Sequence, residues 1–279
     1  MPPMMIVTSL EELRAARTIL EEPLGFVPTM GALHAGHLSL IKQARKENDV
    51  AVTSIFVNPA QFGPGEDYLR YPRDLKTDAL LCKKEGVDII FYPAAGRMYP
   101  EGYKTYVITE SLSNVLCGRF RPGHFRGVAT IVARLFNIVQ PDAAYFGRKD
   151  AQQAVIIQQM ARDLNMPIKI RVMPIIREAD GLALSSRNAY LNARERKDAV
   201  VLCEALKKAE AMIIRGVAVS SKIKLAMRGI IRKKKTARIQ YLEIVDPVEL
   251  KPVKKIRDEA LIALAVYIGR TRLIDNMII

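Results

Sequence analysis

Three histidines, His34, His37 and His124, all lie within two residues of a glycine and next to the ends of expected helices or strands. Two of them belong to the segment PTMGALHAGHLSL, residues 28–40, which follows an expected strand and opens an expected helix. The first amides of a helix have no partner within it and carry the positive end of its dipole, so they favour an anion. Glycines let this backbone approach a bound group closely. Two imidazoles at the same helix start predict hydrogen bonds to phosphate oxygens.

The spacing of His34 and His37 favours a phosphate-binding site over a zinc site. Zinc-binding histidines on one helix face are usually four residues apart, as in H-E-x-x-H, whereas these two are three apart with a glycine between them. The H-x-G-H pattern resembles that of nucleotidyltransferases, in which the α-phosphorus is attacked and diphosphate leaves. The alternative is that each histidine is structural, but the glycine-flanked position of all three favours a site.

The segment YFGRKDAQQ, residues 145–153, is a second candidate. Its expected strand ends at Gly147, and ligands of open α/β sheets bind beyond the carboxyl ends of the strands. Lys149 would neutralise charge that develops on phosphate. Gln152 and Gln153 would bind a hydroxyl or carboxylate group. The alternative is a helix-capping aspartate beside a solvated lysine.

Three further segments have polar side chains in loop-like positions. Asn58 and Gln61 in FVNPAQFGPGEDYLRYPRD follow an expected strand, and their amides suit a substrate with both hydroxyl and carboxylate groups. The loop GRFRPGHFRG carries His124 among arginines, which indicates a surface that faces an anion. The sequence SSRN, Ser185–Asn188, resembles the KMSKS-type loop that accompanies H-x-G-H, and its arginine would close over phosphates.

Strand-like and helix-like segments alternate up to about residue 176, and they would position these side chains. The expected strands are 25–30, 50–58, 87–93, 143–147 and 168–176, and the expected helices are 37–49, 75–86, 127–139 and 151–165. The run 50–58 is nearly continuously apolar, as expected of a strand covered on both faces. The alternation predicts a Rossmann-like α/β domain with a parallel, doubly wound sheet.

The pattern changes after residue 176. Helices are expected at about 193–214 and 219–233, followed by strands at 238–246, 260–269 and 271–279. These strands have no crossover helices between them, which predicts a small antiparallel sheet. We therefore expect two domains, an α/β domain at 1–176 and a smaller α+β domain at 177–279.

The bulk composition is that of a globular protein from a reducing compartment. Of 279 residues, 49% are hydrophobic and 26% are charged, and no apolar run approaches the roughly 20 residues that span a bilayer. The N-terminus has no secretory signal pattern, so we expect a cytoplasmic protein without membrane contact. Cys82, Cys117 and Cys203 are far apart, which disfavours a disulfide framework or a zinc site. The helical patterns around Cys82 and Cys203 predict that both are buried.

The net charge of +14 is concentrated toward the C-terminus, where residues 176–279 carry 22 Lys and Arg against 12 Asp and Glu. Such a surface attracts a polyanionic substrate or nucleic acid, or is simply a solvated helix face. No RNA-binding fingerprint and few aromatic stacking residues occur there, so we expect no nucleic acid partner.

Five motifs in uninterrupted order resemble the pantothenate synthetase (pantoate–β-alanine ligase) family. They are PTMGALHAGHLSLI, SIFVNPAQFGPGEDYLRYPRD, RPGHFRGVATIVARLFNIVQPD, YFGRKDAQQ and DGLALSSRNAYL, within about residues 25–192. The resemblance implies condensation of (R)-pantoate with β-alanine through pantoyl-adenylate, with ATP and Mg²⁺, releasing AMP and diphosphate. It also implies a Rossmann-like nucleotidyltransferase domain, a C-terminal lid domain and a cytoplasmic homodimer in the coenzyme A pathway.

The resemblance also assigns roles to residues. It implies ATP binding by Met30, Gly31, Ala32, Leu33, His34, Ala35, Gly36 and His37, by Gly147, Arg148, Lys149 and Asp150, and by Ile176, Leu184, Ser185, Ser186 and Arg187. Catalytic roles fall to His37, His34, Lys149 and Arg187. Gln61, Gln153 and Asn58 would bind pantoate, and Gln61 would also touch β-alanine. No side chain is assigned to a metal, because Mg²⁺ would bridge phosphate oxygens with few direct protein ligands.

A different adenylating transferase would share the nucleotide site, and only the substrate-side residues argue against it. A structural or interaction module does not explain the polar, glycine-rich strand ends.

Overall fold

The computed structural model describes residues 3–20 and 23–279, and the chain divides into two compact units. The first unit contains Met1–Asn114, Gly118–Gly147 and Ile156–Pro174, and the second contains Val115–Cys117, Arg148–Val155 and Ile175–Ile279. The division into functional domains at residues 176 and 177 stays a prediction. No helix of the described ranges is long and apolar enough to cross a membrane.

A parallel sheet forms the centre of the first unit. Within the described residues, its six strands are ordered β1-β4-β3-β2-β5-β6. They are β1 Met5–Val7, β2 Leu24–Thr29, β3 Val50–Ile55, β4 Ile89–Phe91, β5 Ala143–Gly147 and β6 Lys169–Met173. Every residue of β3 is buried, as its apolar pattern predicted. The strand order reverses between β2 and β5, which is where ligands of such sheets bind.

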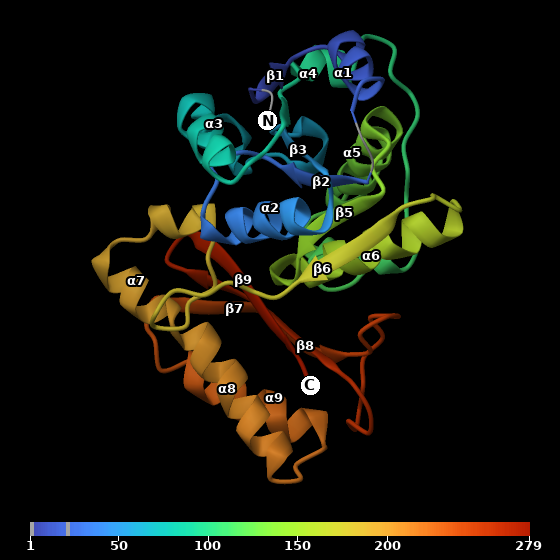
Figure 1. The fold of residues 1–279 in the computed structure, drawn as a ribbon. Helices are drawn as coiled ribbons and strands as arrows, with labels where there is room; N and C mark the ends of the chain where they lie inside the picture. The colour runs from blue at the N-terminus through green and yellow to red at the C-terminus, as the bar shows by residue number, and fades with distance from the viewer. Residues whose placement is uncertain (1–2, 21–22) are drawn as a thin grey trace. The chain divides into compact units, whose positions relative to one another are not determined.

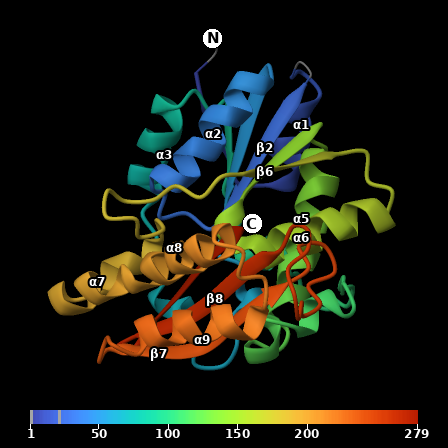
Figure 2. The ribbon, with the colours of Figure 1, turned by 90° about the horizontal axis from the view of Figure 1, so that it is seen from below.

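Helices cover both faces of this sheet. Figures 1 and 2 show α2 (Ala35–Glu47) and α3 (Leu75–Lys84) on one side, and α1 (Leu10–Arg17) and α5 (His124–Val139) on the other. One buried cluster joins α2 and α3 to the sheet and includes Ile41, Cys82 and Tyr145. The shorter helices are α4 Ala95–Met98, η1 Pro59–Gln61, η2 Asp67–Arg70, η3 Leu112–Asn114, η4 Gly118–Phe120 and η5 Arg148–Asp150. Helix α6, Ala151–Asp163, follows β5 and η5.

The second unit has the predicted antiparallel sheet, with the strands ordered β7-β8-β9. These strands are β7 Ala237–Val245, β8 Leu261–Ile268 and β9 Thr271–Ile278, and the helical segments are η6 Ser186–Tyr190, α7 Ala193–Ala199, α8 Val201–Ile214 and α9 Ser220–Ile231. Apolar side chains of α8, α9 and the sheet form one buried cluster, and Figure 2 shows both helices along one face of the strands. The parallel and antiparallel sheets together confirm the predicted fold class.

Several elements differ from the sequence-based prediction. The expected helix at 193–214 is two helices that meet at Val200, whose backbone is itself helical, so the pattern gave no sign of a break. Helix α5 begins at His124, before the expected residue 127, because Gly123 caps it with a φ of 80°. Strand β1 and helix α1 were not predicted, although Ser9 and Glu12 form a capping box that marks the start of α1.

Candidate active site

The H-x-G-H segment lies at the carboxyl end of β2, where the strand order reverses. Gly31 and Ala32 turn the chain with positive φ angles of 79° and 50°. The buried carboxylate of Asp78 on α3 accepts the backbone N–H groups of Ala32 at 3.0 Å and Leu33 at 2.8 Å. Burial raises the pKa of Asp78 despite these two donors. A carboxylate that sequence reasoning did not single out therefore holds the left-handed turn before His34.

Both histidines of this segment cap helix α2. His34 is the N-cap, and its Nδ1 accepts the N–H of Gly36 at 3.1 Å. The N–H of His34 in turn donates to Nδ1 of His37 across a long 3.4 Å, and the two ring centroids are 4.1 Å apart. An accepting nitrogen carries no proton, so this network assigns the proton of each neutral ring to Nε2. Both rings thus become Nε2–H donors at a helix start, which suits an anion.

Asn58 and Gln61 form a second arrangement, just beyond β3. Asn58 is 1% exposed and caps the short helix η1. Its Nδ2 donates to Oε1 of Gln61 and to the carbonyl of Gly127, both at 3.1 Å. Nε2 of Gln61 lies 2.9 Å from the sulfur of Met30, so the two ends of the Gln61 amide have distinct partners.

Gly127 on α5 permits this arrangement. A Cβ atom at Gly127 would lie 2.1 Å from the carbonyl oxygen of Ala60, a distance that no side chain tolerates. The absence of a side chain lets η1 pack directly on α5, and this contact fixes the Asn58–Gln61 segment.

His124 and Arg121 also bond to the backbone of this segment, at the carbonyl of Gln61. Nδ1 of His124 lies 2.7 Å from the carbonyl oxygen of Gln61, so Nδ1 donates. Arg121 donates from Nε to Glu66 at 2.6 Å, and its Nη1 lies 3.1 Å from Nε2 of His124. Burial raises the pKa of Glu66, but the hydrogen bonds and charge of Arg121 outweigh burial and hold that pKa below its usual value. The expectation that the loop at 118–127 faces an anion stays a prediction, and its His124 is bonded within the protein.

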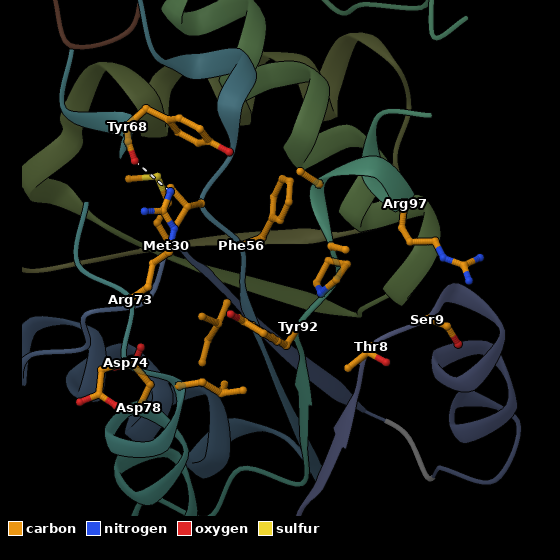
Figure 3. Close-up of a pocket in the computed structure, with 17 residues that line it drawn as sticks. Thr8, Ser9, Met30, Phe56, Tyr68, Arg73, Asp74, Asp78, Tyr92 and Arg97 are labelled. Carbon is orange, nitrogen blue, oxygen red and sulfur yellow. Dashed lines mark hydrogen bonds between the residues drawn. The ribbon is translucent and has the colours of Figure 1, made fainter. Parts of the chain in front are cut away.

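A cavity of about 500 Å³ adjoins the start of the H-x-G-H segment in the first unit. Figure 3 shows Met30, Arg73, Asp78 and Tyr92 around it. Of the predicted ATP-binding residues, Met30 and Gly31 line this cavity. The cavity therefore adjoins the turn at Met30 and Gly31, which precedes the helix that His34 and His37 cap.

In the second unit, Lys149 and Asp150 belong to η5, which continues the chain directly after β5. Nζ of Lys149 lies 3.6 Å from Oδ2 of Asp150. Gln152 is buried, accepting the N–H of Cys117 at 2.9 Å and donating to the carbonyl of Val115 at 2.8 Å. Gln153 is half-buried. Gln152 therefore has a structural role, which leaves Gln153 as the predicted pantoate ligand on this helix.

The other predicted nucleotide segment of this unit forms a hairpin. The N–H of Leu184 donates to the carbonyl of Ile176 at 3.0 Å, so two predicted ATP-binding residues are directly paired. Ser185 follows as the N-cap of η6 and accepts the N–H of Arg187 at 3.3 Å. The Asn188 amide donates to Glu178 at 3.0 Å and to the carbonyl of Ala183 at 3.1 Å. The SSRN loop is thereby attached to the hairpin that precedes it.

The structure groups the predicted site residues within each unit. The first unit contains the H-x-G-H segment, Asn58, Gln61 and Gly147, and the second contains Arg148–Asp150, Gln153 and the hairpin residues. Sequence reasoning did not identify Asp78, Tyr99 or Asn276, which hold the backbone or the side chains of these groups. Only Asn276 had a local signal, because it follows Asp275 inside an otherwise apolar strand pattern.

Comparison with known proteins gives a consistent result along the whole chain. The family model for pantoate-beta-alanine ligase matches residues 5–278. A pantothenate synthetase of Caldicellulosiruptor saccharolyticus is 54% identical over 256 residues, covering 92% of this chain and 91% of the relative. The pantothenate synthetase of Fervidobacterium nodosum is 56% identical, with 92% and 91% covered.

Solved structures agree. The crystal structure of pantothenate synthetase from Thermus thermophilus matches with a TM-score of 0.94 and 47% identity, covering 98% of this chain and 99% of that one. A pantoate-beta-alanine ligase from Francisella tularensis, complexed with beta-gamma ATP and beta-alanine, matches with a TM-score of 0.82 and 36% identity, covering 98% and 97%.

Proposed function

The chain belongs to the pantoate–β-alanine ligase family, and on that premise we propose that it condenses (R)-pantoate with β-alanine through a pantoyl-adenylate intermediate. ATP is consumed, and AMP and diphosphate are released with pantothenate. The observation that carries the proposal is the pair of histidines capping α2 at the end of β2, within the strand reversal of the sheet. Gln61 lies beside this segment, with its amide next to Met30.

The first step is attack of the pantoate carboxylate on the α-phosphorus of ATP, in line with the departing diphosphate. Gln61 and Gln153 hold the pantoate. The Nε2–H groups of His34 and His37 donate to phosphate oxygens, and Lys149 offsets the charge that moves onto the leaving diphosphate. Binding of the nucleotide further involves the other residues of the three predicted stretches, including Ser185, Ser186 and Arg187.

The second step is attack of the β-alanine amine on the acyl carbonyl of pantoyl-adenylate. The C–N bond of pantothenate forms and the amine loses a proton. The bond between the acyl carbon and the phosphate oxygen breaks, and AMP leaves with its electron pair. Gln61 contacts both acids, so its fixed amide orientation serves both steps.

We propose that a magnesium ion would arrive with the nucleotide, with few direct protein ligands. Among residues 3–20 and 23–279, no three His, Cys, Asp or Glu side chains gather closely enough to enclose a metal ion. Mg²⁺ keeps water and phosphate oxygens as most of its ligands in such sites, and would neutralise phosphate charge. Asp150, beside Lys149, is the carboxylate nearest in sequence to the proposed phosphate-binding residues.

Diphosphate release from ATP and Mg²⁺ tests the proposal, measured with (R)-pantoate in the presence and absence of β-alanine. We expect sustained release only with both acids, with AMP and pantothenate as products. No release with pantoate, but release with another carboxylic acid, would keep the adenylating mechanism and overturn the substrate.

We also propose, from the family resemblance, a homodimer that works in the cytoplasm. Light scattering on the purified chain tests the dimer, and a monomer at micromolar concentration would contradict it.

A further inference from the structure

Asn276 on the last strand of the second unit bonds to the backbone of the Arg148–Asp150 segment. Its Nδ2 donates to the carbonyl oxygens of Arg148 and of Lys149, both at 2.9 Å. The side chain is buried, since Asn276 is only 3% exposed. Both N–H bonds of the amide are therefore used on two successive carbonyls. The opposite amide orientation would place Oδ1 against two carbonyl oxygens, so the contacts themselves fix which end is nitrogen.

These two bonds set the backbone from which the Lys149 side chain projects. The ion pair of Lys149 with Asp150 is long, at 3.6 Å, and the Asp150 side chain is 49% exposed. Exposed pairs of this kind contribute little to fixing a side chain. The buried, doubly bonded Asn276 is thus the stronger constraint on this segment.

Asp275, the neighbour of Asn276, acts on the other nucleotide segment. Asp275 is 2% exposed. Its carboxylate accepts hydrogen bonds from both terminal nitrogens of Arg177, at 2.7 and 2.9 Å. Arg177 is paired with Ala183 in the hairpin that also contains Ile176 and Leu184. Hydrogen bonding to Asp275 raises the pKa of Arg177. Adjacent residues of a strand point to opposite faces, so β9 anchors one segment on each face.

We propose that Asn276 is a positioning residue for Lys149 in the ATP-consuming step. The inference rests on the proposed function, because Lys149 has its role only if phosphates bind beside it. Asn276 touches no substrate, and it acts by holding the two carbonyls that orient the lysine. Small displacements of a charge-stabilising group cost rate, on the order of a hundredfold for about 1 Å.

A double-mutant cycle separates positioning from a general structural role. The four proteins are the wild type, N276A, K149A and N276A/K149A, each assayed for pantoate-dependent exchange of labelled diphosphate into ATP without β-alanine. We expect N276A to lose about tenfold or more of the exchange rate. In the K149A background the same substitution should cost less than about twofold, because the two changes act on one interaction.

N48A is the matched control. Asn48 is also buried, and its Nδ2 donates to the carbonyl of Ala44 and to the hydroxyl of Tyr145, both at 2.7 Å, away from the predicted site residues. This variant should lose melting temperature like N276A and keep its exchange rate. If N276A does not fold, N276S retains a smaller donor and enters the same cycle.

The outcomes distinguish this inference from the function it rests on. A wild type without pantoate-dependent exchange removes the proposed function. An active wild type with a wild-type rate in N276A removes the positioning role alone. Losses that multiply in the double variant also overturn it, because they assign Asn276 an effect independent of Lys149.

Discussion

The hydroxyl group of Tyr99 donates a hydrogen bond to Oδ1 of Asn58 at 2.8 Å. The same oxygen accepts the N–H of Ala60 at 3.2 Å, while Nδ2 of Asn58 bonds to Gln61 and to the carbonyl of Gly127. Burial raises the pKa of Tyr99 far above its usual value, so the hydroxyl stays a donor throughout the neutral range. The Asn58 side chain therefore makes four hydrogen bonds, and one of them sets the orientation of the Gln61 amide.

Replacing Tyr99 with phenylalanine should weaken pantoate use. The variant removes one hydrogen bond, worth about 1 kcal/mol of folding free energy, and leaves the Asn58 amide held by its other three bonds, so its orientation is less strongly fixed. We expect the KM for pantoate to rise several-fold while the KM for ATP changes little. Y103F is the control, because Tyr103 packs edge-on against Tyr99 and the change leaves the Tyr99 hydroxyl in place. Equal pantoate KM values in Y99F and wild type would show that Asn58 holds its orientation without the tyrosine.

Local patterns predicted most of the elements, and the residues that we propose to face a ligand also come from such patterns. The histidines were recognisable because glycines flank them and a strand precedes them. Buried apolar runs made the parallel strands predictable, and β5 has the predicted bounds at 143–147. Each of these signals lies within about ten residues of chain, which is the range that periodicity covers.

The residues that support the site were not predictable in this way. Asp78 occupies an amphipathic helix pattern in which a single aspartate looks like part of the solvent face, and its partner Ala32 lies 46 residues earlier. Tyr99 and Asn58 are 41 residues apart. Such contacts depend on strand order, and the chain alone does not say that β4 lies next to β3.

Replacing Asp78 with asparagine should loosen the turn before His34. The carboxylate accepts two backbone N–H groups, whereas an amide offers one oxygen and sets its own N–H groups against the other donor. An unsatisfied buried donor costs about 1–3 kcal/mol, and a mispositioned loop lowers the exchange rate on the order of tenfold. D74N is the control, because asparagine also serves well as the N-cap of α3. Identical kinetics in D78N and D74N would contradict this role.

The pair formed by Glu66 and Arg121 should make folding stability sensitive to acid. The folded pKa of Glu66 lies below its ordinary value of 4.5. Its contribution is therefore fully present above the unfolded pKa and is lost as pH falls through the folded pKa. We expect the melting temperature of the wild type to fall more steeply than that of E66Q between roughly pH 5 and pH 3.

The exposed pair of Glu249 and Lys251 provides the comparison for this measurement. Its atoms are 3.3 Å apart, and both side chains are mostly exposed, so E249Q should follow the wild-type curve. Parallel curves for E66Q and the wild type would mean that Arg121 does not stabilise the charged form of Glu66 in solution.

Two substitutions of His37 distinguish its role in capping helix α2 from its proposed catalytic role. Nδ1 of His37 accepts the N–H of His34, and a glutamine at this third helical position can accept the same N–H. H37A should therefore lose the cap, at about 1 kcal/mol of stability, whereas H37Q should retain it. Both variants lack the imidazole: alanine offers no donor, and the amide of glutamine can donate a hydrogen bond to a phosphate but cannot give up a proton as an imidazolium can. We expect kcat to fall about a hundredfold or more in each, since positioned acid groups contribute on that scale. Melting curves and diphosphate release on the same samples test this, and near-normal turnover in H37Q would reduce His37 to a capping residue.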